Sequence, residues 1–107
     1  MRLLLDESIP SRLRRSLTEH SVRTVVEAGW SGVKNGKLLV LAATEFDAFI
    51  TVDKNLPFQQ NLATLPIALL VLDSVSNELS ALLPLVPVLL RELDSLKPKS
   101  YTLVKLA

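Results

Sequence analysis

Three short, largely apolar segments of the chain each end in an aspartate: residues 3–6 read LLLD, residues 50–53 read ITVD and residues 70–73 read LVLD. Continuous apolar runs of this length are typical of strands buried on both faces of a parallel sheet. In such a sheet the carboxyl ends of all strands lie along one edge. The sequence therefore predicts a parallel sheet with aspartates gathered at one edge.

Predicted strands and helices alternate along the whole chain. Strands are expected at residues 2–6, 21–26, 48–53, 67–73 and 101–106, and helices at residues 9–18, 37–45 and 77–96, with a short helical piece after residue 53. Ser8 and Asn77 are the expected N-caps, and Pro84 and Pro87 should bend or divide the last helix. This order predicts an α/β fold, a three-layer sandwich with a mostly parallel sheet of about five strands and right-handed crossovers. Residues 1–107 are expected to form a single domain.

Charge and residue counts exclude several classes of site. Twelve Lys and Arg against eleven Asp and Glu leave a net charge of +1, so the chain is not a protein that coats nucleic acid by overall charge. Cysteine is absent and His20 is the only histidine, which excludes disulfides and thiolate or histidine-rich zinc sites. A metal site in this chain must therefore be built from oxygen ligands.

One apolar run, ALLPLVPVLL at residues 81–90, has to be weighed as a membrane segment. It is about half the roughly twenty residues that a spanning helix needs, and two prolines interrupt it, so no membrane span is expected. The excess of Leu and Val over residues 79–93 instead predicts a homo-oligomer contact. Because a strand begins at once, without the pattern of a signal peptide, the expected location is cytoplasmic.

The strand-end acids suggest a metal site. If the first strand is central, with the second and third on either side, Asp6 and Asp53 meet where the strand order reverses. Two carboxylates in one crevice favour a hard cation, Mg²⁺ or Mn²⁺, which can bind a phosphate oxygen and activate water for phosphodiester hydrolysis. The same residues can also act simply as caps of helix N-termini.

Four other residues are weaker candidates for the site, two as metal ligands and two as RNA contacts. Glu7 is either a further ligand or a solvated acid of the first helical turn, and Asn35 is either a turn and N-cap residue or a carboxamide ligand. Lys54 and Arg12 are candidates for attracting the backbone of an RNA substrate, although basic residues on a helix most often form its solvated outer face.

Two motifs carry a family resemblance. LLLDESIP at residues 3–10 and FITVDKNLPFQQN at residues 49–61, joined by an Ala-Gly-Trp loop and NGKLLVLAA, resemble the small PIN-like proteins, compact relatives of the PIN-domain ribonucleases. The resemblance covers nearly the whole chain, so residues 1–107 are expected to form a single PIN-like domain. It implies a parallel α/β sandwich with an acidic Mg²⁺ or Mn²⁺ site, in which Asp6 matches the acid of the first strand, and Thr51 and Asp53 match a Thr-x-Asp motif.

The activity that the resemblance implies, by analogy with PIN toxins, is cleavage of single-stranded RNA, as the toxin of a toxin–antitoxin pair with an antitoxin protein as partner. Catalysis would then involve Asp6, Asp53, Glu7 and Asn35, with Asp6 and Asp53 as metal ligands. The chain departs from the family at two positions: Ser8 stands where relatives usually have Asn, and Asn35 where many have Asp. Loss of that third carboxylate predicts weak metal affinity.

Two other classes of function remain open. Receiver-like signalling domains also place an acid pair after the first strand and a phosphoacceptor aspartate after the third, and DKNLP at residues 53–57 resembles that phosphoacceptor loop. In this chain, however, Lys97-Pro98 precedes the last strand, whereas receivers carry such a lysine after it. The third possibility is a catalytically silent binding module.

Overall fold

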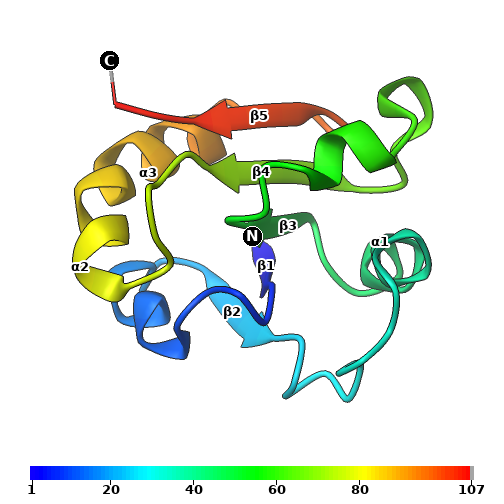
Figure 1. Cartoon of the computed structure of the whole chain (residues 1–107), viewed down its shortest axis with the longest axis horizontal. Helices are drawn as coiled ribbons and strands as arrows, with labels where there is room; N and C mark the ends of the chain where they lie inside the picture. The colour runs from blue at the N-terminus through cyan, green and yellow to red at the C-terminus, as the bar shows by residue number, and fades with distance from the viewer. Residues whose placement is uncertain (107) are drawn as a thin grey trace.

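The computed structural model describes residues 1–106, which form a sheet of five parallel strands between two layers of helices (Figure 1). The strands are β1 (Arg2–Leu5), β2 (Ser21–Thr24), β3 (Ala48–Thr51), β4 (Ala68–Leu72) and β5 (Tyr101–Val104). Their order in the sheet is β2-β1-β3-β4-β5, and every neighbouring pair is parallel. The predicted α/β sandwich is therefore confirmed, and β1 has the central place that the metal-site hypothesis required.

Each face of the sheet is covered by its own helices. One layer consists of the 3-10 helix η1 (Ser11–Ser16), α2 (Leu79–Leu82), the 3-10 helix η4 (Leu83–Leu85) and α3 (Val86–Asp94). The other contains α1 (Asn35–Ala43) and the two 3-10 helices η2 (Leu56–Gln59) and η3 (Leu62–Thr64). Figure 1 shows α2 and α3 on one side of the sheet and α1 on the other.

The run of three leucines in β1 is explained by these two layers. Leu3 and Leu5 point into the core under η1, α2 and α3, whereas Leu4 points into the core under α1. All three side chains are fully buried. Burial of a leucine stabilises a fold by about 1.5–3 kcal/mol, so β1 is among the best-anchored parts of the molecule.

The helix expected at residues 9–18 is shorter and tighter than predicted. It is the six-residue 3-10 helix η1, and its N-cap position is Pro10, which offers no side-chain cap. Ser8 is not the N-cap, because its hydroxyl donates to a carboxylate oxygen of Asp6. Asn77 is not a cap either: Glu78 holds the N-cap position of α2, and the Asn77 amide donates to the carbonyl of Ser8 at 3.0 Å.

The apolar region 79–93 is divided as its prolines predict. Pro84 lies in η4 and Pro87 lies near the start of α3. Leu82, Leu85, Leu89 and Leu93 are buried against the sheet, and the one large apolar side chain of this region in the exposed class is Leu83. The leucines that suggested an oligomer contact thus fill the interior of the protomer, and self-association stays a prediction. Within residues 1–106, no helix has the length and apolar character needed to cross a membrane.

The crossover between β4 and β5 differs from the others. Going from β3 to β4 and from β4 to β5, the chain moves in the same direction across the sheet, but the first connection lies on the α1 face and the second on the α2–α3 face. These two crossovers must therefore have opposite hands, which contradicts the expectation that all are right-handed. The short η1 leaves most of its face uncovered, and the long connection through α2 and α3 returns over that face to cover it.

Candidate functional site

Asp6 lies where β1 ends at the carboxyl edge of the sheet. Its backbone N–H donates to the carbonyl of Ile50 at 2.9 Å, which extends the pairing between β1 and β3 by one residue. Because β1 has a paired strand on each side and a core on each face, the backbone that carries this carboxylate is held rigidly.

The carboxylate of Asp6 already accepts three hydrogen bonds. Oδ1 accepts from the backbone N–H of Glu7 at 2.9 Å, and Oδ2 accepts from the hydroxyls of Ser8 at 2.9 Å and Thr51 at 2.7 Å. An ionised carboxylate offers about four lone-pair positions. Roughly one position therefore remains for a cation or another donor, unless a hydroxyl turns away.

Thr51 connects the two predicted acids. Its fully buried hydroxyl donates to Asp6 Oδ2 and accepts from the backbone N–H of Asp53 at 3.0 Å. One hydroxyl group therefore ties the end of β3 to the end of β1. Asp6 and Asp53 follow two neighbouring strands at the switch point, and the meeting of their carboxylates in one crevice stays a prediction.

The Asp53 carboxylate accepts fewer hydrogen bonds than that of Asp6. Its Oδ1 accepts from the backbone N–H of Asn55 at 2.9 Å, and its carbonyl accepts from the N–H of Leu56 at 3.2 Å, so it starts the turn that leads into η2. Over the described part of the chain, no hydrogen bond or ion pair reaches its second oxygen, Oδ2. Asp53 therefore has an oxygen available for a ligand.

The third strand-end acid has another role. Asp73 follows β4, one strand farther from β1, and its Oδ1 is paired with the ammonium of Lys54 at 2.7 Å. Lys54, predicted to attract RNA, is thus held by an acid, although its side chain remains half exposed.

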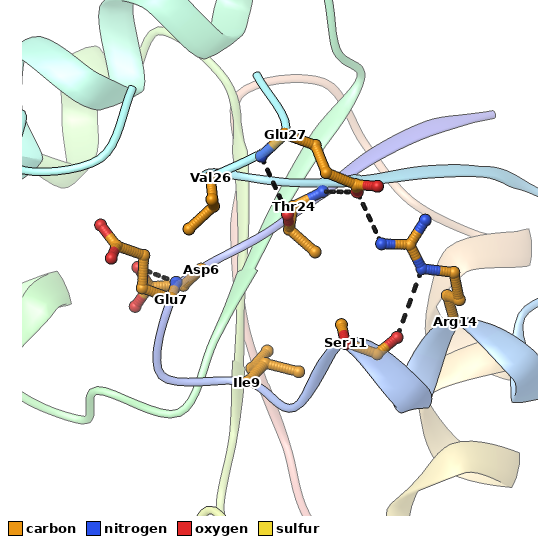
Figure 2. Close-up of a pocket in the computed structure, with 8 residues that line it drawn as sticks. All are labelled: Asp6, Glu7, Ile9, Ser11, Arg14, Thr24, Val26 and Glu27. Atoms are coloured by element: carbon orange, nitrogen blue, oxygen red, sulfur yellow. Dashed lines mark hydrogen bonds and ion pairs between the residues drawn. The ribbon is translucent and has the colours of Figure 1, made fainter. Parts of the chain in front are cut away.

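A cavity of about 380 Å³ lies beside Asp6, within the size range of small-molecule sites (Figure 2). Its lining comes from the end of β1, from η1 and from the end of β2: Asp6, Glu7, Ile9, Ser11, Arg14, Thr24, Val26 and Glu27. Figure 2 shows Asp6 and Glu7 on one side of this space and Arg14 on the other. A ligand in the cavity would therefore lie between carboxylates and a guanidinium.

Arg14 and Glu27 form an ion pair at the wall of the cavity, with Nη2 and Oε1 2.6 Å apart. The same Oε1 accepts from the N–H of Thr24 at 2.9 Å, and the hydroxyl of Thr24 accepts from the N–H of Glu27 at 3.1 Å. The hydrogen bond from Arg14 and that from Thr24 lower the pKa of Glu27 from 4.5 to about 2. Glu27 therefore stays ionised at neutral pH and keeps Arg14 in place.

Arg14, Thr24 and Glu27 were not among the residues predicted for the site. A signal for two of them is present in the sequence, because Thr-x-x-Glu at residues 24–27 is the pattern of a capping box, in which the two residues exchange hydrogen bonds. Arg12, the predicted RNA contact, is an exposed residue of η1 that does not line the cavity.

Glu7 fastens a loop. One carboxylate oxygen accepts from the hydroxyl of Ser31 at 3.1 Å, and the other accepts a long hydrogen bond of 3.4 Å from the N–H of Gly32. The loop between β2 and α1 is thereby attached to the end of β1. Since Glu7 also lines the cavity, it can act on a ligand there as well as hold the loop.

Asn35 is the first residue of α1, and the N-cap position is Lys34, so the predicted N-cap role of Asn35 is wrong. Asn35 is partly buried. In residues 1–106 its side chain has no hydrogen bond to Asp6 or Asp53, and it does not line the cavity. Its predicted role as a ligand stays a prediction.

The acidic side chains near Asp6 and Asp53 determine whether the site can hold a metal ion. Among the described residues, no group of three or more His, Cys, Asp or Glu side chains could hold a metal. Asp6 and Asp53 are the predicted ligands, and metal binding by them stays a prediction. Mg²⁺ and Mn²⁺ are the ions that such a pair would suit, because these hard cations bind one or two carboxylates and complete their shells with water and substrate phosphates.

Comparison of the chain with protein-family models, with curated proteins and with solved structures finds no match.

Proposed function

We propose that this chain is a Mg²⁺- or Mn²⁺-dependent endoribonuclease that cleaves single-stranded RNA at the carboxyl edge of its sheet. The observation that carries the proposal is the Asp6–Thr51–Asp53 connection at the switch point of a parallel sheet, in which the Thr51 hydroxyl donates to the Asp6 carboxylate and accepts from the backbone N–H of Asp53. Two carboxylates that share one crevice at this edge of the sheet would favour a bound cation.

Asp6 and Asp53 would hold the ion, Asp53 through its free Oδ2 and Asp6 through its remaining lone-pair position. When bound, such an ion supplies a Lewis acid for a phosphate oxygen and lowers the pKa of a coordinated water. With two carboxylates and no third, the expected affinity is weak, and the RNA phosphate would contribute to binding.

The cavity beside Asp6 is the proposed binding site for the RNA strand. Arg14 faces Asp6 across it, and a guanidinium is the side chain best suited to bidentate contact with a phosphate. Glu27 keeps this guanidinium oriented when no substrate is present. We therefore assign substrate binding to Arg14 in place of Arg12, with Lys54 as a weaker contact that must exchange Asp73 for a phosphate.

The resemblance of the two acidic motifs to small PIN-like proteins adds to the proposal, and it extends it to a role as the toxin of a toxin–antitoxin pair, with an antitoxin protein as partner. A gene for a small DNA-binding protein directly upstream would support this extension.

The decisive experiment compares wild type with Asp53→Asn on a pool of unstructured RNAs, with Mn²⁺ and with EDTA. Asp53→Asn is the preferred variant, because its Oδ1 can still accept from Asn55, whereas Asp6→Asn would lose an acceptor for the hydroxyls of Ser8 and Thr51. Cleavage should require Mn²⁺ and vanish in Asp53→Asn. Asp94→Asn, which changes an exposed acid of α3, is the matched control. Cleavage that persists in EDTA or in Asp53→Asn would overturn the proposal.

A receiver-like phosphoacceptor is the second candidate, and one observation favours it. Lys105 directly follows β5, at the same edge of the sheet as Asp53, whereas Lys97 precedes that strand. Against this, the last crossover departs from the right-handed rule that doubly wound folds follow. Incubation with acetyl phosphate separates the two: a stable mass increase of one phosphoryl group, absent in Asp53→Asn, would favour the receiver. A protein that neither cleaves RNA nor takes up phosphate would be a silent binding module.

A further inference from the structure

One aromatic side chain of this protein, Phe58, is almost fully exposed to solvent. Of the three phenylalanines, Phe49 is fully buried and Phe46 nearly so, whereas Phe58 is 87% exposed. Trp30 is partly buried against Phe46. The Phe58 ring gains nothing for folding in this position, and both of its faces are free to contact a ligand.

Phe58 is presented by a turn that starts at Asp53. Asn55 donates its N–H to Asp53 Oδ1, Leu56 donates to the Asp53 carbonyl, and Phe58 donates to the carbonyl of Asn55 at 3.1 Å. The two residues before Phe58, Leu56 and Pro57, are buried and anchor η2 in the core. The exposed ring is therefore fixed to the same hydrogen-bonded unit as a proposed metal ligand.

The chain around Phe58 is polar but uncharged. Residues 55–61 read NLPFQQN, which contains four amide side chains and no acid or base. Amides can pair with the edges of nucleobases, while an aromatic ring stacks on their faces. Phosphate contacts would call for Lys or Arg.

A protein partner fits this surface less well. From residue 54 to residue 67, the one large apolar side chain in the exposed class besides Phe58 is Leu62, at 44%. A single ring among amides is far smaller than the several hundred Å² of contiguous apolar surface that mark a protein interface. An unpaired nucleobase matches it in size.

We propose that Phe58 is the stacking platform for an unpaired base of the RNA strand whose backbone passes the Asp6–Asp53 pair. This inference rests on the proposed ribonuclease function and names the part of the substrate that the protein binds. Stacking accepts any base, so Phe58 provides affinity for single-stranded RNA without sequence choice.

The test measures binding separately from cleavage. A labelled, unstructured oligoribonucleotide is titrated in EDTA, followed by fluorescence anisotropy, with wild type, Phe58→Ala, Phe58→Trp and Val40→Ala. Val40 is an exposed apolar residue of α1 and serves as the matched control. Phe58→Ala should weaken binding about tenfold, as expected for loss of one stacked base, while Val40→Ala binds as wild type. Phe58→Trp should retain affinity, and RNA should quench its added indole fluorescence.

The outcomes separate the inference from the function on which it rests. If wild type cleaves RNA but Phe58→Ala binds and cleaves equally well, the stacking inference is overturned and the ribonuclease stands. If binding depends on Phe58 but no RNA is cleaved, the ribonuclease fails and Phe58 remains an RNA contact. If wild type neither binds RNA in EDTA nor cleaves it with Mn²⁺, both are overturned, and Phe58 becomes a protein contact to be sought by cross-linking from that position.

Discussion

Thr51 is the residue on which the geometry of the site depends most. Its hydroxyl is buried and serves as donor to Asp6 and as acceptor for the N–H of Asp53. The Thr-x-Asp motif pointed to Thr51 in the sequence, but only the structure shows that the threonine is hydrogen-bonded to both acids. The site thus depends on a side chain that would not itself touch a substrate.

Replacement of Thr51 by valine tests this role. The shapes are similar, but the N–H of Asp53 and one oxygen of Asp6 would lose a buried partner. We expect the free energy of unfolding to fall by about 1–3 kcal/mol, measured by urea denaturation. Thr51→Ser keeps the hydroxyl, so its free energy of unfolding should fall clearly less than that of Thr51→Val. Equal losses in the two variants would mean that packing of the methyl group, and not the hydroxyl, is what matters.

The ion pair of Glu27 predicts a pH dependence. Because Arg14 and Thr24 lower the pKa of Glu27 from 4.5 to about 2, the folded state favours the ionised form. The stability gained in this way is fully present above the unfolded-state value, near pH 4.5, and is lost as the pH falls toward 2. Glu27→Gln should therefore be less stable than wild type at pH 7, with a difference that shrinks between these two values. A difference that stays constant down to pH 2 would contradict the assigned pKa.

At the residue scale, prediction from sequence succeeded for local patterns and failed for side-chain partners. Asp6 and Asp53 could be found because strand ends are visible in the sequence. The partners of Ser8 and Asn77 could not, since both were assigned to local capping, whereas Asn77 bonds to a carbonyl 69 positions away. Which arginine faces the cavity was not predicted either: Ser11 and Arg14, three residues apart in η1, lie on the same side of this short helix and line the cavity together.

Among the elements, α3 shows how a short amphipathic helix is held. Leu89 and Leu93 lie one turn apart on its buried face, and Pro87 occupies the first turn, where the missing N–H is tolerated. The heavily apolar composition of residues 79–93 pointed to an interface because a domain of this size was expected to have too little interior for it. The broken helix solves this by placing its leucines over the face that η1 leaves open.

Two leucine-to-alanine substitutions in this region should therefore have very different effects on the free energy of unfolding. Leu89→Ala opens a cavity in the core and should lower the free energy of unfolding by about 2–5 kcal/mol. Leu83→Ala removes a side chain that is 43% exposed and should change it by less than about 1 kcal/mol. Chemical denaturation measures both. If Leu83→Ala were the more damaging, and the effect depended on protein concentration, Leu83 would lie in the predicted oligomer contact.

Over the whole molecule, the two neighbours of β1 were predictable and the handedness of the last crossover was not. The alternation of strands and helices leads to a parallel sheet, and the strand-end acids suggest which strands are neighbours. The face taken by the last connection follows from area: η1 is a six-residue helix, and the sheet above it must be covered by whatever chain remains. How much of each sheet face is covered depends on the entire fold. Local sequence patterns therefore do not predict it.

Metal binding should also be visible as a property of the whole molecule. A cation that binds only the folded state stabilises it by RT ln(1 + [L]/Kd), which is roughly 1.4 kcal/mol at ten times Kd. For a domain of this size, that corresponds to an increase in Tm of roughly 6 °C. Mn²⁺ at millimolar concentration should therefore raise the Tm of wild type, and calorimetric titration should give a matching affinity.

The same measurement on variants locates the ion. Asp53→Asn removes one of the two proposed ligands but keeps the Oδ1 acceptor of its turn, so the folded state should persist while the Mn²⁺-dependent rise in Tm disappears. Asp94→Asn should respond as wild type. If Asp53→Asn and wild type shift equally, the ion binds elsewhere. If neither shifts, the three hydrogen bonds on Asp6 are sufficient to occupy its carboxylate, and Thr51 then holds the end of β1 closed against a metal instead of arranging a site for one.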